Sequence, residues 1–126
     1  MIYGVGIDII DIRRIQRVFE KYGSKFKKKC FHDNEISKAD NRYKWIETYS
    51  KRYAAKEACA KALGTGLAKG VFWKDIEIIN DKFGKPEIVL HNNAKQLVEK
   101  FNNKYKIEVS LSDEKEFAIA NVIIFV

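Results

Sequence analysis

Two carboxylates lie among small or apolar residues instead of on an evidently polar surface. Asp8 follows Gly4 and Gly6 at alternate positions in MIYGVGIDII, and Glu57 lies among the five alanines of KRYAAKEACAKALGTG. Burying an unpaired carboxylate is costly, so each acid needs a cation, a hydrogen-bond donor or water nearby. Two such acids suit Mg²⁺, which prefers oxygen ligands, keeps several waters and commonly bridges substrate phosphates. Asp8 and Glu57 are therefore candidate magnesium ligands.

Lys61 is the third residue that could carry chemistry at this site. It lies one helical turn after Glu57, where its ammonium group could contact a phosphate oxygen on the same ion. The alternative is an i,i+4 pair of Glu57 and Lys61 on the helix surface, which stabilises by only roughly a few tenths of a kcal/mol. Spacing alone favours that surface pair.

Other familiar catalytic arrangements do not occur in the sequence. His32 and His91 are the only histidines. Neither has a partner at ligand spacing, so we interpret both as surface or helix-capping residues. No nucleophile elbow, phosphate loop, dinucleotide fingerprint or zinc-ligand spacing is present. The sequence therefore argues against a histidine-dependent triad and against a structural zinc site.

Length and composition predict one globular domain over residues 1–126. A chain of 126 residues with 46% hydrophobic residues can bury roughly two-thirds of its unfolded surface. The first residues lack a basic region and include an acid, which is atypical of a signal peptide, and no apolar run could span a bilayer. Cys30 and Cys59 lack CxxC spacing, which indicates reduced thiols. We expect a cytoplasmic protein without a membrane contact.

The positive charge is concentrated in the N-terminal half. The net charge is +7, and residues 11–61 hold 15 basic and 7 acidic residues. This asymmetry predicts an acidic partner, either a nucleic acid or an acidic protein. The alternative is a solvated basic helical surface without a partner.

Hydrophobic periodicity predicts an α+β fold in which a largely antiparallel sheet packs with helices. The first strand is expected to turn Tyr3, Val5, Ile7 and Ile9 toward the core. The other predicted elements are a helix capped by Asp11 and ended by Gly23, a helix starting near 32–35, a helix over 44–63, strands over 71–80 and 86–90, a helix over 92–102, and strands over 105–111 and 117–126.

Four segments, in order, resemble the holo-[acyl-carrier-protein] synthase family, the small bacterial type of phosphopantetheinyl transferase. They are GVGIDIIDIRRI at 4–15, KRYAAKEACAKALGTG at 51–66, FWKDIEIINDKFGKPEI at 72–88 and VSLSDEKEFAIANVII at 109–124. The resemblance covers nearly the whole chain and implies a phosphopantetheinyl transferase-like fold. It also implies Mg²⁺-dependent transfer of 4′-phosphopantetheine from coenzyme A to a serine of apo-acyl carrier protein, with release of 3′,5′-ADP, in support of fatty acid biosynthesis.

The resemblance also assigns roles to residues. It places the two metal-binding acids on Asp8 and Glu57, and it implies that Lys61 stabilises or protonates the departing phosphate. The serine proton would pass to a metal-bound water or a nearby carboxylate, and the identity of the base stays open. Many family members have histidine where this chain has Asp113, so a role for that histidine is not carried over. The implied coenzyme A groove includes two turns, formed by Gly64, Thr65 and Gly66 and by Gly84, Lys85 and Pro86.

The acidic partner implied by the resemblance is acyl carrier protein. Its acidic helix would dock on Arg14 and on the neighbouring Arg13, Arg17 and Lys21. The family also implies a homotrimer whose active sites are shared between protomers. The alternative function is a basic nucleic-acid-binding module, although the aromatic residues are scattered and no recognised binding motif occurs.

Overall fold

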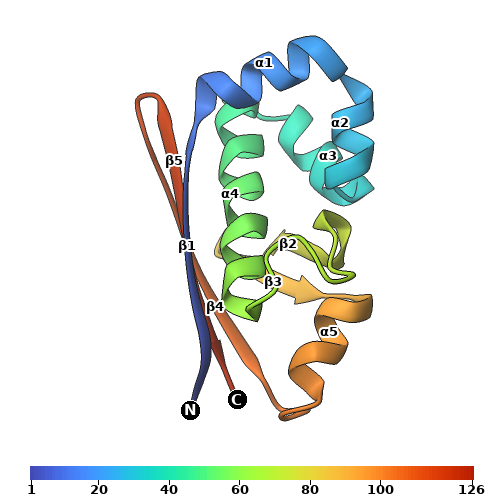
Figure 1. The fold of residues 1–126 in the computed structure, drawn as a ribbon. Coiled ribbons are helices and arrows are strands. Elements are labelled where there is room, and N and C mark those ends of the chain that lie inside the picture. Colours follow the sequence, from blue (N-terminus) through green and yellow to red (C-terminus); the bar gives the residue numbers. More distant parts are fainter.

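Helix α4 runs through the middle of the molecule, with a sheet along one side and a hairpin and shorter helices along the other (Figure 1). The computed structural model describes residues 1–126. Its elements are β1 (Ile2–Asp11), α1 (Ile12–Tyr22), α2 (Ser24–Cys30), α3 (Asp33–Asp40), α4 (Trp45–Leu63), a 3₁₀ turn η1 (Trp73–Asp75), β2 (Ile76–Asn80), β3 (Pro86–Leu90), α5 (Asn92–Glu99), β4 (Lys106–Glu114) and β5 (Phe117–Phe125). None of the helices is both long and apolar enough to cross a bilayer.

The strands form two antiparallel sheets, which confirms the predicted α+β class. The larger sheet has the order β1-β5-β4, so β1 and β4 are its two edges, and β2 pairs with β3 in a separate hairpin. In the larger sheet Val5 lies opposite Ile123, and Ile9 lies opposite Ile119. Residues opposite each other in an antiparallel pair share a face, so these four side chains lie on the same side of the sheet.

The predicted orientation of β1 was wrong. Its glycines, not its large residues, face helix α4: a Cβ atom added to Gly6 would lie 1.8 Å from the carbonyl oxygen of Ala58. Strand and helix backbones are so close that only glycine fits there. Val5, Ile7 and Ile9 point away from the core and are 57%, 58% and 63% exposed.

Local capping follows the sequence closely at several helix ends. Asp11 accepts a hydrogen bond from the backbone N–H of Arg13 at 2.9 Å, which confirms it as the cap of α1. Gly64 ends α4 with a φ of 86°, a left-handed conformation that favours glycine. Some elements differ from expectation. The turn η1 delays the start of β2 to Ile76, α5 ends at Glu99 and β4 continues as far as Glu114, while α2 is an additional helix.

A buried ion pair joins the helical layer to η1 and the hairpin. Lys56 is fully buried, and its Nζ donates to Glu35 Oε1 at 2.8 Å and to the carbonyl oxygen of Trp73 at 3.1 Å. The second Glu35 oxygen accepts the backbone N–H of Ile78 at 3.2 Å. A buried charge is tolerated only when it is paired and hydrogen-bonded, as both are here. The network therefore holds Trp73 against α4.

Candidate active site

Asp8 and Lys61 form an ion pair between β1 and α4. Asp8 continues the glycine side of β1 toward the helix, and its side chain is 16% exposed. The Lys61 Nζ atom lies 3.1 Å from Asp8 Oδ1 and donates to the carbonyl oxygen of Ile7 at 2.9 Å. The alternative surface pair of Lys61 with Glu57 does not form, since Lys61 turns to the strand.

Glu57 lies near Asp8, and the two negative charges oppose each other. Burial raises the pKa of Glu57, and the charge of Asp8 raises it further. Tyr53, Trp73 and Lys61 act in the opposite direction on the same carboxyl. The structure therefore brings Asp8, Glu57 and Lys61 together from two elements far apart in the chain. Two adjacent carboxylates from a strand and a helix are a donor set that fits a divalent cation with oxygen preference, such as Mg²⁺.

Two aromatic residues line the Glu57 side of this site. The rings of Tyr53 and Trp73 stack with centroids 6.3 Å apart. Burial, with a smaller contribution from the charge of Glu57, raises the pKa of Tyr53 to about 12, so its phenol keeps its proton. Trp73 Nε1 is buried without a partner of good hydrogen-bond geometry, yet its N–H is close enough to lower the pKa of Glu57. A group bound at Glu57 could accept from this free donor.

Tyr53 precedes Glu57 by four residues, and Glu57 precedes Lys61 by four, so the three share one helix face. The sequence gave no sign of Trp73, because η1 reaches α4 through the buried Lys56 contact. A lone tryptophan between two apolar segments carries no spacing signal of its own. The missing information was therefore tertiary.

An apolar groove adjoins the same aromatic wall. It has a volume of about 410 Å³ and two lysines among its lining residues. We call it the Tyr22 groove; it is lined by Val18, Tyr22, Lys25, Phe26, Lys29, Cys30, Tyr53 and Trp73. The groove connects the basic helices α1 and α2 to the residues around Glu57.

The four cations predicted on α1 are not equivalent. Arg13 lies 2.7 Å from Asp11 and 3.4 Å from Glu116, and its hydrogen bonds lower the pKa of Asp11 to about 2. Arg14, Arg17 and Lys21 make no salt bridge within the chain. These three cations are therefore available to an acidic partner, whereas Arg13 is engaged.

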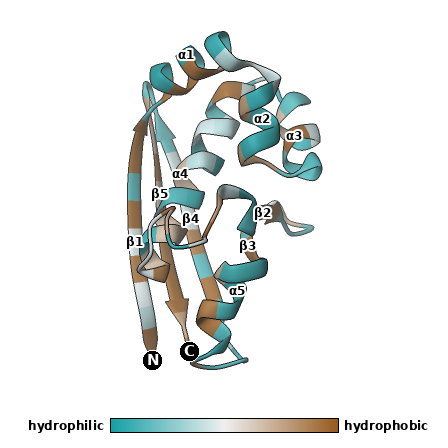
Figure 2. Ribbon diagram, turned by 45° about the vertical axis from the view of Figure 1, so that its right-hand side comes forward, coloured by the Kyte–Doolittle hydropathy of each residue, from teal (hydrophilic) through white to brown (hydrophobic).

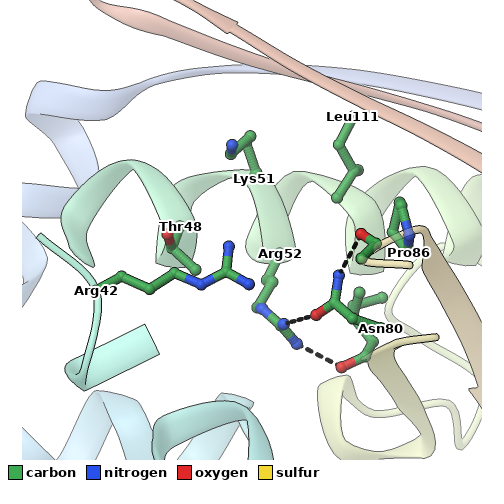
Figure 3. A pocket seen from close by; sticks show the side chains of 9 residues that line it. Arg42, Thr48, Lys51, Arg52, Asn80, Pro86 and Leu111 are labelled. Atoms are coloured by element: carbon green, nitrogen blue, oxygen red, sulfur yellow. Dashed lines mark hydrogen bonds between the residues drawn. The ribbon is translucent and has the colours of Figure 1, made fainter. Parts of the chain in front are cut away.

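A second, polar pocket lies beside the β2–β3 hairpin (Figure 3). Its volume is about 180 Å³, and it contains three cations, Arg42, Lys51 and Arg52. We call it the Arg42 pocket; its lining residues are Arg42, Thr48, Lys51, Arg52, Ile78, Asn80, Gly84, Pro86 and Leu111. Two residues of the predicted Gly84-Lys85-Pro86 turn thus line a cationic pocket.

The cations of the Arg42 pocket differ in their freedom. Arg52 donates to Asn80 Oδ1 at 2.7 Å and to the carbonyl oxygen of Ile78, so it is held in place (Figure 3). Lys51 pairs with Asp113 at 3.0 Å. Arg42 makes no salt bridge. Asp113, which stands where many family members have histidine, thus neutralises a pocket lysine in this chain.

The other predicted coenzyme A residues lie outside that pocket. Lys85 pairs with Glu108 at 3.2 Å and does not line it. The Gly64–Gly66 turn follows the last residue of α4, where the Thr65 hydroxyl donates to the carbonyl oxygen of Gly66 at 2.7 Å. Gly64 lines a different cavity from the one that Gly84 and Pro86 line.

The Arg42 pocket and the Asp8–Glu57 site lie on opposite sides of α4. Thr48, Lys51 and Arg52 are roughly 180° around the helix from Tyr53, Glu57 and Lys61. The two sites also approach opposite edges of the larger sheet, because Asp8 is on β1 and Leu111 is on β4.

Neither histidine has a partner at ligand spacing along the sequence, yet the fold brings the two together. The rings of His32 and His91 lie with centroids 5.2 Å apart, and both approach Glu77. Each histidine is the residue preceding a helix, α3 or α5, as a capping role requires. Spacing could not reveal the pair, because the two helix ends meet only in the folded chain.

Comparison with known proteins gives a consistent assignment. Residues 4–122 match the 4′-phosphopantetheinyl transferase superfamily. The chain is 45% identical to the holo-[acyl-carrier-protein] synthase of Agrobacterium fabrum, over 98% of this chain and 95% of that protein. The structure of holo-[acyl-carrier-protein] synthase from Neisseria meningitidis superposes with a TM-score of 0.88 at 34% identity, and covers 100% of both chains.

A further relative was solved with a ligand. The Helicobacter pylori holo-[acyl-carrier-protein] synthase in complex with coenzyme A has a TM-score of 0.83 at 30% identity, over 96% of this chain and 99% of that one. The present chain belongs to the 4′-phosphopantetheinyl transferase superfamily and, within it, to the holo-[acyl-carrier-protein] synthase family.

Proposed function

We propose that this protein transfers the 4′-phosphopantetheine group of coenzyme A to a serine of apo-acyl carrier protein and releases 3′,5′-ADP. The observation that carries the proposal is the approach of Asp8 and Glu57, with Lys61 beside them, in a chain of this family. A cytoplasmic location and a contribution to fatty acid biosynthesis are part of the proposal.

Asp8 and Glu57 would hold Mg²⁺ through their carboxylate oxygens. When bound there, the ion would neutralise negative charge that develops on the diphosphate of coenzyme A. The nearby Lys61 ammonium group donates to the released phosphate oxygen and stabilises or protonates it. The serine hydroxyl loses its proton to a carboxylate of this site or to water. The free N–H of Trp73 gives the site one further donor.

The negative charge of the nucleotide part of coenzyme A is complementary to the positive charge of the Arg42 pocket. Guanidinium groups bind phosphate oxygens in a bidentate manner, and Arg42 has no competing carboxylate in the chain. Gly84 and Pro86 supply a turn at the rim of the same pocket. Because this pocket and the Asp8–Glu57 site lie on opposite sides of α4, one coenzyme A molecule would contact the two sites on different copies of the chain.

The outward face of the larger sheet provides a surface for that association. Val5, Ile7 and Ile9 of β1 lie beside Ile119 and Ile123 of β5, and hydrophobic colouring runs along both strands (Figure 2). An apolar patch of this kind on a sheet face is typical of an interface between subunits. Contact between the β1 edge of one copy and the β4 edge of the next is heterologous, and three such contacts close a homotrimer.

Acyl carrier protein would dock on α1 and reach the site through the Tyr22 groove. Arg14, Arg17 and Lys21 offer unpaired positive charge to its acidic helix, and the adjoining groove offers apolar surface. This combination of charge with an apolar groove beside Glu57 favours a protein partner. The nucleic-acid-binding alternative is not favoured.

Mass spectrometry of the carrier protein tests the proposal. Incubation of apo-acyl carrier protein with coenzyme A, Mg²⁺ and this protein should add the mass of phosphopantetheine to the carrier. The gain should disappear with chelator, with Glu57→Ala, and with a carrier that lacks the acceptor serine. An unmodified carrier in the complete mixture, with salt-sensitive retention of the protein on DNA or RNA, would instead favour the nucleic-acid-binding module.

A further inference from the structure

Three side chains gather at a place that the transfer reaction does not use. His32 precedes α3, Glu77 is on β2 and His91 precedes α5. One ligand atom from each residue lies within 4.8 Å of the other two. His91 Nε2 lies 2.9 Å from Glu77 Oε1. The three residues are far apart in the sequence and come together only in the folded chain.

The hydrogen bond of His32 determines its tautomer. His32 Nε2 lies 2.6 Å from the carbonyl oxygen of Lys74, which can only accept, so this nitrogen carries a hydrogen. A neutral His32 ring therefore has its lone pair on Nδ1. Donation of one ring N–H to a backbone carbonyl is the arrangement that orients histidines bound to metal ions through their other nitrogen.

We propose that His32, Glu77 and His91 bind a divalent transition-metal ion of the Zn²⁺ type. Two imidazoles and one carboxylate are a ligand set that suits zinc, cobalt, nickel or copper better than magnesium. Three protein ligands leave a fourth position for water. The site differs from Asp8 and Glu57 in its donor atoms and in the elements that carry it.

The distances require only a local adjustment. Metal–ligand bonds of about 2.0–2.1 Å place tetrahedral ligand atoms about 3.4 Å apart. The widest separation is at most 4.8 Å and must therefore shorten by no more than about 1.4 Å, while His91 and Glu77 are already close. The side chain of His91 is 37% exposed, so its ring has room to turn and solvent can deliver the ion. That of Glu77 is 13% exposed, which holds the carboxylate in place.

Bound metal would connect three parts of the chain. It would hold the start of α3, the hairpin strand β2 and the start of α5 to one ion, and η1 would follow through the His32–Lys74 contact. The ion replaces the proton shared by His91 and Glu77, so binding releases protons.

Titration of the chelator-treated, full-length protein with Zn²⁺ in excess Mg²⁺ tests the proposal. Calorimetry should show one ion per chain that Mg²⁺ does not displace. Substitution with Co²⁺ should give visible d–d absorption without the intense band of a thiolate ligand, which would exclude Cys30 and Cys59 as ligands. Stoichiometry below one, displacement by Mg²⁺ or a thiolate band would overturn the proposal.

Variants identify the ligands. His91→Ala and Glu77→Gln should each weaken Zn²⁺ binding by at least about a hundredfold, more than loss of an outer hydrogen-bond partner usually costs. Glu57→Gln and the exposed hairpin variant Glu87→Gln should bind as tightly as the parent. His32→Ala removes a residue at a helix start, so circular dichroism should accompany it, and His91→Ala tests the site if that variant unfolds. Unchanged binding in His91→Ala, or loss in Glu57→Gln, would overturn the assignment.

Discussion

The Nζ atom of Lys61 lies 3.1 Å from Asp8 Oδ1, although the two residues are on different elements, α4 and β1. Lys61 therefore pairs with a residue of the strand and does not form a stabilising pair within its own helix. Its positive charge lies beside Asp8, one of the two acids that would hold Mg²⁺, and its side chain remains 53% exposed to an arriving substrate. The lysine is thus available to a ligand while the strand fixes its position.

Replacing Lys61 should reduce catalysis more than stability. We expect Lys61→Met to lower kcat by about a hundredfold, since loss of one donor to developing negative charge costs roughly that much. The pair with Asp8 is partly exposed, so the midpoint of thermal unfolding should change little. Lys95→Met is the matched control, because it removes a real i,i+4 surface pair with Glu99 on α5 and should leave kcat unchanged. Equal kcat values for the two variants would contradict the role of Lys61.

Removing the charge of Glu57 should separate stability from activity. Its pKa is raised in the folded chain, mainly by burial and then by Asp8, so the ionised form is less favourable in the folded state than in the unfolded state. Glu57→Gln should therefore raise the melting temperature of the metal-free protein by about 1–3 °C at neutral pH and abolish transfer.

The pH dependence of that gain has a definite sign. The gain should be full above the folded-state pKa and should vanish below the ordinary value of 4.5, where the carboxyl is protonated in both states. Calorimetric melting of both proteins from acid to neutral pH measures it. A variant that is less stable at neutral pH would show that Glu57 is stabilising in the metal-free chain.

The arginines of α1 should differ in their effect on the carrier protein. Arg14→Ala should raise KM for acyl carrier protein by about threefold to fivefold and make the rate less sensitive to salt, because it removes an unpaired charge from the docking surface. Arg13→Ala should have a smaller effect, since Asp11 and Glu116 already engage Arg13. Steady-state kinetics at two salt concentrations compare them. A larger effect from Arg13→Ala would place the docking surface elsewhere.

The glycines of β1 should be intolerant of substitution for a structural reason. Gly6→Ala places a Cβ atom 1.8 Å from the carbonyl oxygen of Ala58, so strand and helix must separate. We expect a loss of about 3 kcal/mol in the free energy of unfolding, measured with urea. Ser110→Ala, on the exposed face of β4, is the control and should change it by less than about 0.5 kcal/mol. A tolerated Gly6→Ala would mean that the strand can shift without cost.

Local sequence signals predicted most elements and the candidate acids Asp8 and Glu57, whereas the role of Lys61 came from the family resemblance because spacing alone favoured a surface pair. The start of α1 at Asp11 and the end of α4 at Gly64 could be predicted, because each depends on the side chain or the φ angle of a single residue. The sequence could not predict which face of β1 packs against the core, because alternation of residue types indicates two faces but does not identify the buried one. Large residues on the outer face fit the proposed interface between subunits, which one sequence does not display.

The Arg42 pocket and the histidine pair show the second limit. Lys51 and Asn80 line one pocket because α4 and the hairpin are in contact. The spacing of residues within either segment does not predict that contact. His32 and His91 approach each other for the same reason. Residue chemistry could be assigned in advance, whereas convergence of separate elements required the fold.

In the proposed assembly, Asp8 and Glu57 of one chain act with the Arg42 pocket of a neighbouring chain. Two variants, Glu57→Gln and the double variant Arg42→Ala/Lys51→Ala, should each be nearly inactive in carrier-protein transfer. Co-expressed in equal amounts, they should recover roughly a quarter of parental activity, because random assembly in a closed ring joins the two intact halves at about one interface in four. Activity no greater than that of the separate variants would contradict the shared site.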